Sequence, residues 1–329
     1  MRVLAVTNMY PTAAHPTSGI FVAEQVRGLQ EIQVDVEVFF VDRLKLGMTC
    51  YYRMRHLLPA AVRTFQPDLV HVMYGGVMAS EVTRCALGRP ILVTFHGSDL
   101  FGENHSGLLR KCISHYAVRC SCHAARNAKG VVVVSRWLQG LLAQRVRHGN
   151  VRVIPCGVDL ERFKPMDQVS CRERLGWRDR VFHVLFSNNG TDPVKRPQLA
   201  RAATELLNRS GVPTELHYLH GFAYDQVPIW LNASDVLILT SYREGASTIV
   251  KEALACNVPV VSTDVGDVAE RIEGIDGCYL SEATPEGFAD KLRKVHAGPS
   301  RVASRTRMQD LSLQLIAIRL RAFYEDLLA

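Results

Sequence analysis

The sequence predicts an α/β protein with two domains, each a doubly wound parallel sheet covered by helices. Short apolar runs rich in β-branched residues alternate with segments of helical periodicity along the chain, and Val131–Val134 is the clearest of these runs. Such alternation is typical of parallel strands that are joined by helices. The pattern restarts at Phe182, and 329 residues suffice for two domains that each bury a core.

The first domain is expected to span residues 1–163. Its helical patterns include residues 20–29 and the basic, amphipathic stretch 51–65. The loop of residues 8–19 follows the first strand, and open α/β sheets bind ligands at the carboxyl ends of their strands. The predicted strands are Arg2–Thr7, Val34–Val41, Leu69–Met73, Ile91–Phe95, Val131–Val134 and Val151–Ile154.

The second domain is expected to span residues 164–303, and a closing helix over 304–329 is expected to pack back on the first domain. Helical patterns cover residues 195–208 and 229–233. The predicted strands are Phe182–Phe186, Glu215–Leu219, Val236–Leu239 and Val258–Val261. Two such domains would face each other across a cleft, which is a usual place for ligand-binding groups.

Two glutamates near the strand Val236–Leu239 are arranged in a way that suits an anionic ligand. Glu244 lies in the turn after the strand, and Glu252 lies on the following helix, roughly 12 Å further along its axis. The helix between them begins with small residues, whose backbone N–H groups and helix dipole favour an anion. A nucleotide-sugar, with a diphosphate between a sugar and a ribose, fits this pattern. An exposed helix with solvated Lys251 and Glu252 fits it equally well.

The net charge of +7 is concentrated in the first half of the chain. Residues 107–149 contain eight Arg and Lys residues and no acidic residue, so this segment should attract an anionic surface such as the inner leaflet of a membrane. The stretch 51–65 mixes basic with apolar residues, as interfacial helices do. Helices that pack on a sheet and expose basic outer faces would have the same composition. No nucleic-acid-binding module is recognisable, so nucleic acid is not an expected partner.

The chain is expected in the cytoplasm, with at most a peripheral attachment to the inner face of the cytoplasmic membrane. No apolar run approaches the ~18–20 residues of a membrane span, and the apolar start is too short for a signal peptide. Nine scattered cysteines indicate a reducing compartment. Because Cys112, Cys120, Cys122 and His123 lack the spacing of a zinc motif, no metal site is expected.

Four segments resemble, in order and spacing, the group 1 glycosyltransferases of family GT4. Glu244 and Glu252 match the E-x7-E signature of that family, and the other segments are Ser18–Val22, Phe95–Asp99 and Val153–Asp159. The resemblance covers nearly the whole chain and is nearest to bacterial cell-surface polysaccharide transferases of the teichuronic-acid type. It implies the GT-B fold, in which an N-terminal Rossmann-like domain lies on the acceptor side and a C-terminal one binds the nucleotide-sugar.

The resemblance also implies a reaction. A sugar would be transferred with retention of configuration from a UDP-, GDP- or ADP-sugar to a hydroxyl of a glycan or lipid-linked acceptor, without a metal ion or other cofactor. Glu244 would contact the donor sugar and stabilise the charge that develops on its ring. His96 would face that sugar, and Lys195 would neutralise the leaving diphosphate. The residues implied to bind the donor are Gly19, Asn188, Asn189, Arg196, Gly245, Ala246, Ser247, Thr248 and Glu252.

The chain departs from the family just before Lys195. The family has a Gly-Arg pair there, whereas this chain has Asn188-Asn189-Gly190 and lacks the arginine. The asparagine amides or Arg196 could replace part of its action. Complete loss of that cation would cost on the order of 2–4 kcal/mol of transition-state stabilisation. Two alternatives therefore stay open: a sugar-nucleotide epimerase with the same fold, and a non-catalytic protein that binds sugar-nucleotides.

Overall fold

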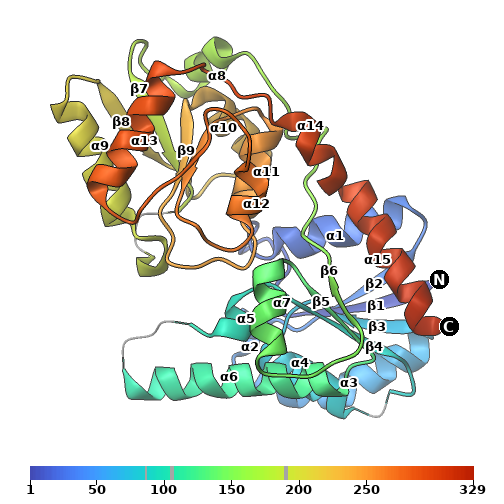
Figure 1. The fold of residues 1–329 in the computed structure, drawn as a ribbon. Helices are drawn as coiled ribbons and strands as arrows, with labels where there is room; N and C mark the ends of the chain where they lie inside the picture. Colours follow the sequence, from blue (N-terminus) through green and yellow to red (C-terminus); the bar gives the residue numbers. More distant parts are fainter. Residues whose placement is uncertain (86, 104–106, 189–191) are drawn as a thin grey trace. The chain divides into compact units, whose positions relative to one another are not determined.

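The chain folds into two compact units (Figure 1). The structure, a computed structural model, describes residues 1–85, 87–103, 107–188 and 192–329. Unit 1 comprises Met1–Gly157 and Leu313–Ala329, and unit 2 comprises Val158–Ser312. The boundaries predicted from the sequence follow residues 163 and 303, whereas those of the structure follow Gly157 and Ser312. The boundaries differ because the junction segments pack together within unit 2, where the Arg305 guanidinium donates to the carbonyl of Leu160 at 2.6 Å.

Unit 1 is built on a parallel sheet that has, within the described residues, six strands. They are β1 (Arg2–Thr7), β2 (Asp35–Phe40), β3 (Leu69–Val72), β4 (Ile91–Phe95), β5 (Gly130–Val133) and β6 (Val151–Val153). Their order across the sheet is β2-β1-β3-β4-β5-β6. The chain order therefore reverses between β1 and β3, which makes the loops after these strands the topological switch point of the sheet.

The helices of unit 1 follow the strands as the alternating pattern predicts. They are α1 (Ile20–Glu31), α2 (Arg43–Leu46), α3 (Thr49–Phe65), α4 (Gly76–Arg84), α5 (Ser98–Phe101), α6 (Leu108–Asn127), α7 (Arg136–Ala143) and α15 (Leu313–Leu328). In α3, the buried residues recur every three or four positions, so its apolar side packs inward and its arginines point to solvent. Within the part of the chain that the structure describes, none of the helices combines the length and apolar character that crossing a bilayer requires.

Unit 2 contains a second parallel sheet, with five strands within its described residues. They are β7 (Phe182–Phe186), β8 (Thr214–Tyr218), β9 (Val236–Leu239), β10 (Val260–Ser262) and β11 (Tyr279–Leu280). Their order is β11-β10-β9-β7-β8, so the switch point lies between β7 and β9. The two predicted doubly wound parallel sheets are thus confirmed.

The helices of unit 2 include short 3-10 turns beside the sheet. They are α8 (Gln168–Leu175), η1 (Pro193–Lys195), α9 (Pro197–Arg209), η2 (Tyr224–Gln226), α10 (Val227–Ala233), α11 (Thr248–Ala255), α12 (Val268–Ile272), α13 (Pro285–Ala297), α14 (Arg305–Met308) and η3 (Gln309–Leu311). Helices α9 and α13 pack on one face of the sheet, where alternate residues of β7 such as Val184 and Phe186 join Leu207 and Phe288 in the core.

The chain closes differently from the single helix predicted over residues 304–329. The segment contains α14, the turn η3 and then α15, and the break falls at Ser312, whose backbone is extended. Ser312 forms a β-bridge with Val158, and this pairing interrupts the helix. After the break, α15 packs within unit 1, where the Tyr324 hydroxyl lies 2.7 Å from Nδ1 of the buried His71.

Candidate functional site

Lys195 and Glu244 form an ion pair at the switch point of the unit 2 sheet. Lys195 ends η1 after β7, and Glu244 lies in the loop after the neighbouring strand β9. The Lys195 ammonium donates to Glu244 Oε1 at 2.6 Å, and the Ser241 hydroxyl donates to the same oxygen at 2.6 Å. The side chains are 27% and 14% exposed, so both can meet a ligand. Opposite charges therefore lie side by side where open α/β sheets bind ligands.

Hydrogen bonds hold the two loops of this ion pair together. The Arg196 guanidinium donates to the carbonyls of Thr240 at 2.5 Å and Ser241 at 3.1 Å, and it lies 4.5 Å from the centre of the Tyr242 ring. In the other direction, the Thr240 hydroxyl donates to the carbonyl of Lys195 at 2.6 Å. Arg196 thus stabilises the loop after β9, a role that the sequence did not predict.

Gly266 brings the loop after β10 against the loop that carries Glu244. Its φ of +62° is in the left-handed region that favours glycine. A Cβ at this position would lie 3.2 Å from Glu244 Cβ and 3.1 Å from the Gly245 carbonyl oxygen. Gly245, which is buried, therefore packs directly against the loop after β10, and the next residue, Ala246, is half-buried.

Asp267 occupies the N-terminus of α11. Ser247 is the N-cap residue, but its side chain accepts no capping hydrogen bond, and its backbone N–H donates to Asp267 Oδ1 at 3.2 Å. Asp267 Oδ2 lies 3.0 Å from Arg271 Nε and 3.5 Å from Lys251 Nζ. This buried network was not predicted from the sequence. A Lys-Glu pair within the otherwise apolar helix TIVKEALA was the available signal that these charges are buried.

Glu252 is buried on α11 and is oriented by a tyrosine. It is 4% exposed, and the Tyr224 hydroxyl donates to its Oε1 at 2.7 Å. The neighbouring Lys251 is fully buried. The interpretation of this helix as a solvated surface helix is therefore wrong. Tyr224 begins η2, and its ring packs 5.6 Å from that of Phe163.

In unit 1, Gly19 determines the path of the loop after β1. It is the N-cap residue of α1 and has a φ of +65°. A Cβ here would lie 2.3 Å from the carbonyl carbon and oxygen of Met9 and 2.7 Å from the backbone nitrogen of Tyr10. Only glycine allows the loop to pass this close to the start of the helix.

His96 lies at the carboxyl end of β4, where Asp99 holds its backbone. The N–H of His96 and that of the next residue donate to Asp99 Oδ1 at 3.1 and 2.7 Å. Burial raises the pKa of Asp99, although these N–H groups favour the charged form. The His96 ring lies 4.6 Å from that of Phe21 on α1, stacks at 6.2 Å on Tyr74, and has its Nδ1 3.6 Å from Cys156 Sγ. The structure therefore brings His96 and the first turn of α1 together.

The predicted site residues thus fall into two groups, one in each unit. Gly19 and His96 belong to unit 1, and the remaining described ones belong to unit 2. Asn188 follows β7 directly, and its N–H donates to the Phe186 carbonyl at 3.1 Å. Asn189 lies outside the described residues.

Residues that could hold a metal ion lie elsewhere on the unit 2 sheet. Within the described ranges, His183, Glu215 and His217 form the one group of three potential ligands. His183 and Glu215 are the second residues of β7 and β8, whereas the loops of the ion pair follow the last residues of their strands. Burial lowers the pKa of His217 to about 4 and also lowers the pKa of His183, so both rings are neutral at pH 7.

Two family models match the chain. The model of glycosyltransferase family 4 matches residues 15–162, and that of glycosyl transferases group 1 matches residues 178–297. The chain belongs to the family 4, group 1 glycosyltransferases. This transferase is 26% identical to a protein of Bacillus subtilis (strain 168) named as the teichuronic acid biosynthesis glycosyltransferase TuaC, and the match covers 89% of each chain. The predicted family is therefore confirmed.

Solved structures show the same fold. Sucrose-phosphate synthase from Thermosynechococcus elongatus matches the transferase with a TM-score of 0.80 and 15% identity over 99% of each chain. Alr3699/HepE of Anabaena, solved in complex with UDP and glucose, matches with a TM-score of 0.72 and 17% identity over 99% of this chain and 100% of that one. The transferase therefore has the predicted GT-B fold.

Proposed function

We propose that this transferase moves a sugar, with retention of configuration, from a nucleoside-diphosphate sugar to a hydroxyl of a glycan or lipid-linked acceptor in polysaccharide synthesis. The ion pair of Lys195 and Glu244 is the observation that best supports this reaction. An ammonium group can neutralise the leaving diphosphate, and a carboxylate beside it can bind sugar hydroxyls and stabilise the positive charge that develops on the ring. Because hydrogen bonds hold the two loops together, both groups are in place before the donor binds.

The rest of the donor would extend along α11. Glu252 lies one turn beyond Thr248, the first residue of the helix, and would bind the ribose. The N–H groups at the start of α11 would bind the diphosphate together with the helix dipole. The N–H of Ser247 can take part only by leaving Asp267.

The unit 1 residues and the proton transfer complete the proposed mechanism. His96 would face the donor sugar, and the loop at Gly19 would approach the phosphates. We infer that no metal ion is needed at the phosphates, since Lys195 and backbone N–H groups supply the positive charge there. The leaving phosphate oxygen would take the proton of the acceptor hydroxyl on the same face of the sugar, which gives retention.

Donor binding in the presence of a chelator tests this proposal. The melting temperature is measured with UDP-, GDP- and ADP-sugars in EDTA, beginning with UDP-glucose because UDP and glucose are bound in Alr3699/HepE. A rise with one nucleotide supports the proposal, and no rise with any of them refutes it. Product analysis with a lipid-diphosphate acceptor then distinguishes a retaining transferase from an epimerase and from a non-catalytic protein. Retained configuration at the new bond is expected, conversion of the donor without acceptor would indicate an epimerase, and binding without turnover would indicate a non-catalytic protein.

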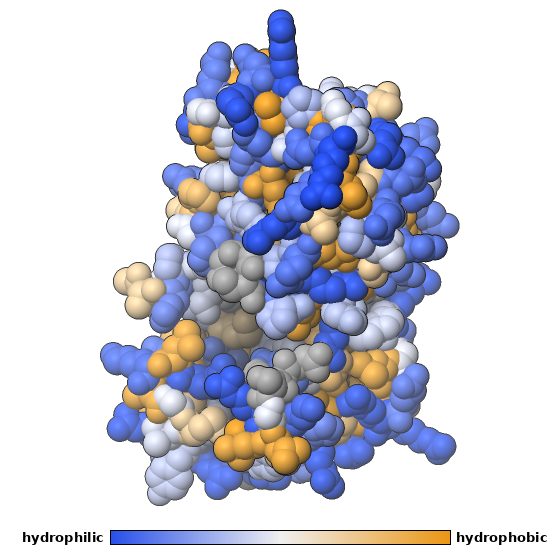
Figure 2. Space-filling view, turned by 90° about the vertical axis from the view of Figure 1, so that its left-hand side faces the viewer, coloured by the Kyte–Doolittle hydropathy of each residue, from blue (hydrophilic) through white to orange (hydrophobic). Residues whose placement is uncertain are grey.

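We further propose that unit 1 binds an anionic membrane surface through α6. This helix has basic residues but no acidic residue, and Leu108 and Leu109 in its first turn are 83% and 75% exposed. Ile113 and Tyr116 continue the exposed apolar side one and two turns further on. The first turn of α6 lies on the left of Figure 1, and Figure 2 shows hydrophobic side chains beside hydrophilic ones on the lower part of that side. Apolar side chains among basic ones are the pattern of an interfacial helix.

Sedimentation with vesicles tests the membrane proposal. Binding to vesicles that contain phosphatidylglycerol should exceed binding to neutral phosphatidylcholine vesicles and should fall as salt rises. Replacing Leu108 and Leu109 by Ser should weaken binding by about tenfold or more, since each buried leucine contributes about 1.5–3 kcal/mol. Val169→Ser on α8 of unit 2, also an exposed apolar residue, is the control. Binding that is absent, independent of salt or unchanged in the double variant contradicts the proposal.

A further inference from the structure

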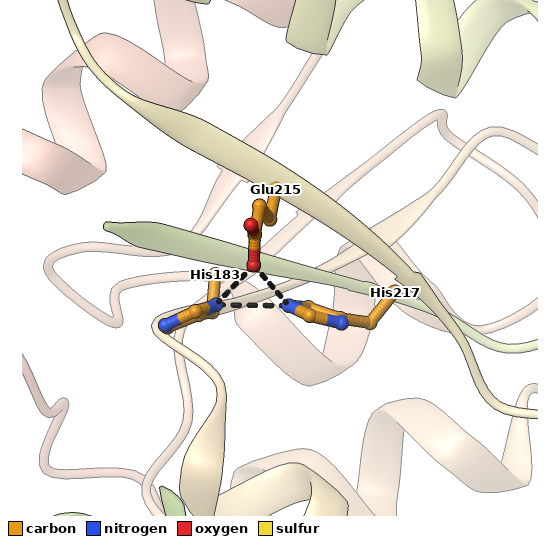
Figure 3. Close-up of side chains that lie close together, drawn as sticks. All are labelled: His183, Glu215 and His217. Atoms are coloured by element: carbon orange, nitrogen blue, oxygen red, sulfur yellow. Dashed lines mark hydrogen bonds and ion pairs between the residues drawn. The ribbon is translucent and has the colours of Figure 1, made fainter. Parts of the chain in front are cut away.

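A cluster of two histidines and a glutamate joins the edge strand of the unit 2 sheet to its neighbour (Figure 3). His183 on β7 is the register partner of Glu215 on β8, and His217 lies two residues further along β8, so the three side chains share one face of the sheet. Nδ1 of His183 lies 2.8 Å from Nε2 of His217, and Oε2 of Glu215 lies 3.8 and 3.7 Å from these two nitrogens. Three potential ligand atoms therefore face one point.

Hydrogen bonds at the outer atoms of His183 and Glu215 orient the atoms that face the centre of the cluster toward a cation. Nε2 of His183 lies 2.8 Å from the carbonyl of Arg178, and because a carbonyl only accepts, Nε2 must carry the proton. Nδ1 then presents its lone pair to the centre of the cluster. The Arg178 guanidinium bonds Oε1 of Glu215, so Oε2 is the oxygen that faces the rings. Histidines that bind metals characteristically donate their outer N–H to a carbonyl or carboxylate in this way.

Aromatic packing holds the second histidine in place. The His217 ring stacks on Trp177 at 3.6 Å with an angle of 10° between the planes. Trp177 also lies 4.8 Å from the His183 ring and meets Trp230 edge to face. The histidine rings are 0% and 16% exposed and Glu215 is 32% exposed, so the cluster is open to solvent on its glutamate side.

The spacing of the three atoms matches the size of a small divalent cation. A point equidistant from atoms separated by 2.8, 3.8 and 3.7 Å lies about 2.0 Å from each of them, and zinc binds histidine nitrogen and carboxylate oxygen at about 2.0–2.2 Å. We propose that His183, Glu215 and His217 bind a Zn²⁺ ion, with water as the fourth ligand. Two imidazoles and one carboxylate form a ligand set that suits zinc.

The ion would stabilise the structure by joining β8 to β7. It is independent of the donor chemistry proposed above, because its ligands lie within the strands rather than in the loops after β7 and β9. On binding, His217 Nε2 turns its lone pair to the metal, and its proton moves through solvent to Nδ1. The hydrogen bond between the two rings is then replaced by two metal–nitrogen bonds.

Metal binding by the full chain tests this site. The purified protein is stripped with a chelator, freed of it, and titrated with Zn²⁺ against a chromophoric competitor while tryptophan fluorescence is followed. One equivalent should bind with a Kd tighter than about 10 µM. Glu215→Gln keeps the size of the side chain and His217→Phe keeps the stacking on Trp177, and each should weaken binding by at least about a hundredfold. The exposed His220, changed to Ala, is the control.

Substitution with Co²⁺ tests in the native chain whether these three side chains bind a metal ion, so the result does not depend on the folding of a variant. The native chain should give the visible absorption of a four-coordinate cobalt site, without the near-ultraviolet band of thiolate ligation. The proposal is overturned if Zn²⁺ binds with a Kd weaker than the stated limit, if the cobalt protein shows a thiolate band, or if the native chain and both folded variants bind Zn²⁺ equally well. The two histidine rings would then form only a hydrogen-bonded pair.

Discussion

Removal of the Lys195 charge should slow sugar transfer about a hundredfold. The substitution Lys195→Met keeps the length of the side chain and removes the ammonium that lies 2.6 Å from Glu244 Oε1. In the proposed reaction the ammonium acts on the leaving diphosphate, and two such unit charges about 4 Å apart interact by roughly 4 kcal/mol at an effective dielectric constant of about 20. Since the lysine is 27% exposed and screened by solvent, we retain about two thirds of that value. The resulting ~2.7 kcal/mol corresponds to a hundredfold loss of turnover.

A double-mutant cycle shows whether the two residues act as one unit. Glu244→Gln should cause a similar loss, and the double variant should lose little more than either single one, because each change already breaks the ion pair. Turnover is measured with the donor that raises the melting temperature. Lys291→Met is the matched control, since Lys291 is 29% exposed, lies in unit 2 and also faces a carboxylate. Near-normal turnover in both single variants, or losses that add fully in the double variant, would refute the reasoning.

Three further predictions follow from contacts in both units. Tyr224→Phe removes the hydrogen bond to Glu252 and should raise the donor Kd by about tenfold, with little change in turnover at saturation. Burial lowers the pKa of His71 to about 3, so between pH 6.5 and 3 only the unfolded state gains a proton, and the free energy of unfolding should fall by about 1.4 kcal/mol per pH unit. His71→Gln should remove that part of the slope in urea titrations. Gly19→Ala should lower stability by about 2 kcal/mol in thermal unfolding, because its Cβ would strike backbone at 2.3 Å.

Tyr218→Phe removes a hydroxyl that contacts Arg201 rather than Glu252, and an equal effect of both tyrosine changes would exclude the specific role. A pH slope that is the same with and without His71 would mean that other groups cause it. Gly149→Ala adds a Cβ that meets no atom within 4 Å, so it should be harmless where Gly19→Ala is not.

The sheets were predictable because buried parallel strands are short apolar runs. Ile91–Phe95 and Val236–Leu239 have the predicted bounds, since polar residues or turn formers bracket each run, and Phe182–Phe186 also has the predicted bounds. The strand Tyr279–Leu280 was missed because two residues carry no periodicity. The closing helix was predicted as continuous because its helical pattern runs across Ser312, and only the pairing of that residue with Val158 interrupts it.

The site was predictable only in part, since local sequence does not reveal side-chain partners. Lys195 and Glu244 each follow a parallel strand, and adjacent strands bring their loops together. The bond from Tyr224 to Glu252 and the burial of Asp267 depend on packing between distant segments. The pairing of His183 with Glu215 likewise requires the register of β7 and β8, which no spacing within the sequence reveals.

Because the chain lacks the arginine that the family has before Lys195, the shape of the Lys195 cation should matter for turnover. The substitution Lys195→Arg tests whether it does. Arg196 is already bonded to the carbonyls of Thr240 and Ser241, so its guanidinium is committed to the loop. An ammonium has three donors that point in different directions, so Lys195 can keep its bond to Glu244 while it binds a phosphate oxygen. A guanidinium is a planar fork that would form two hydrogen bonds either to the Glu244 carboxylate or to the phosphate, but not to both at once. Lys195→Arg should therefore keep donor affinity within a few-fold but leave turnover at least about tenfold below that of the native chain in initial-rate assays. Full recovery of turnover would show that charge alone matters at this position.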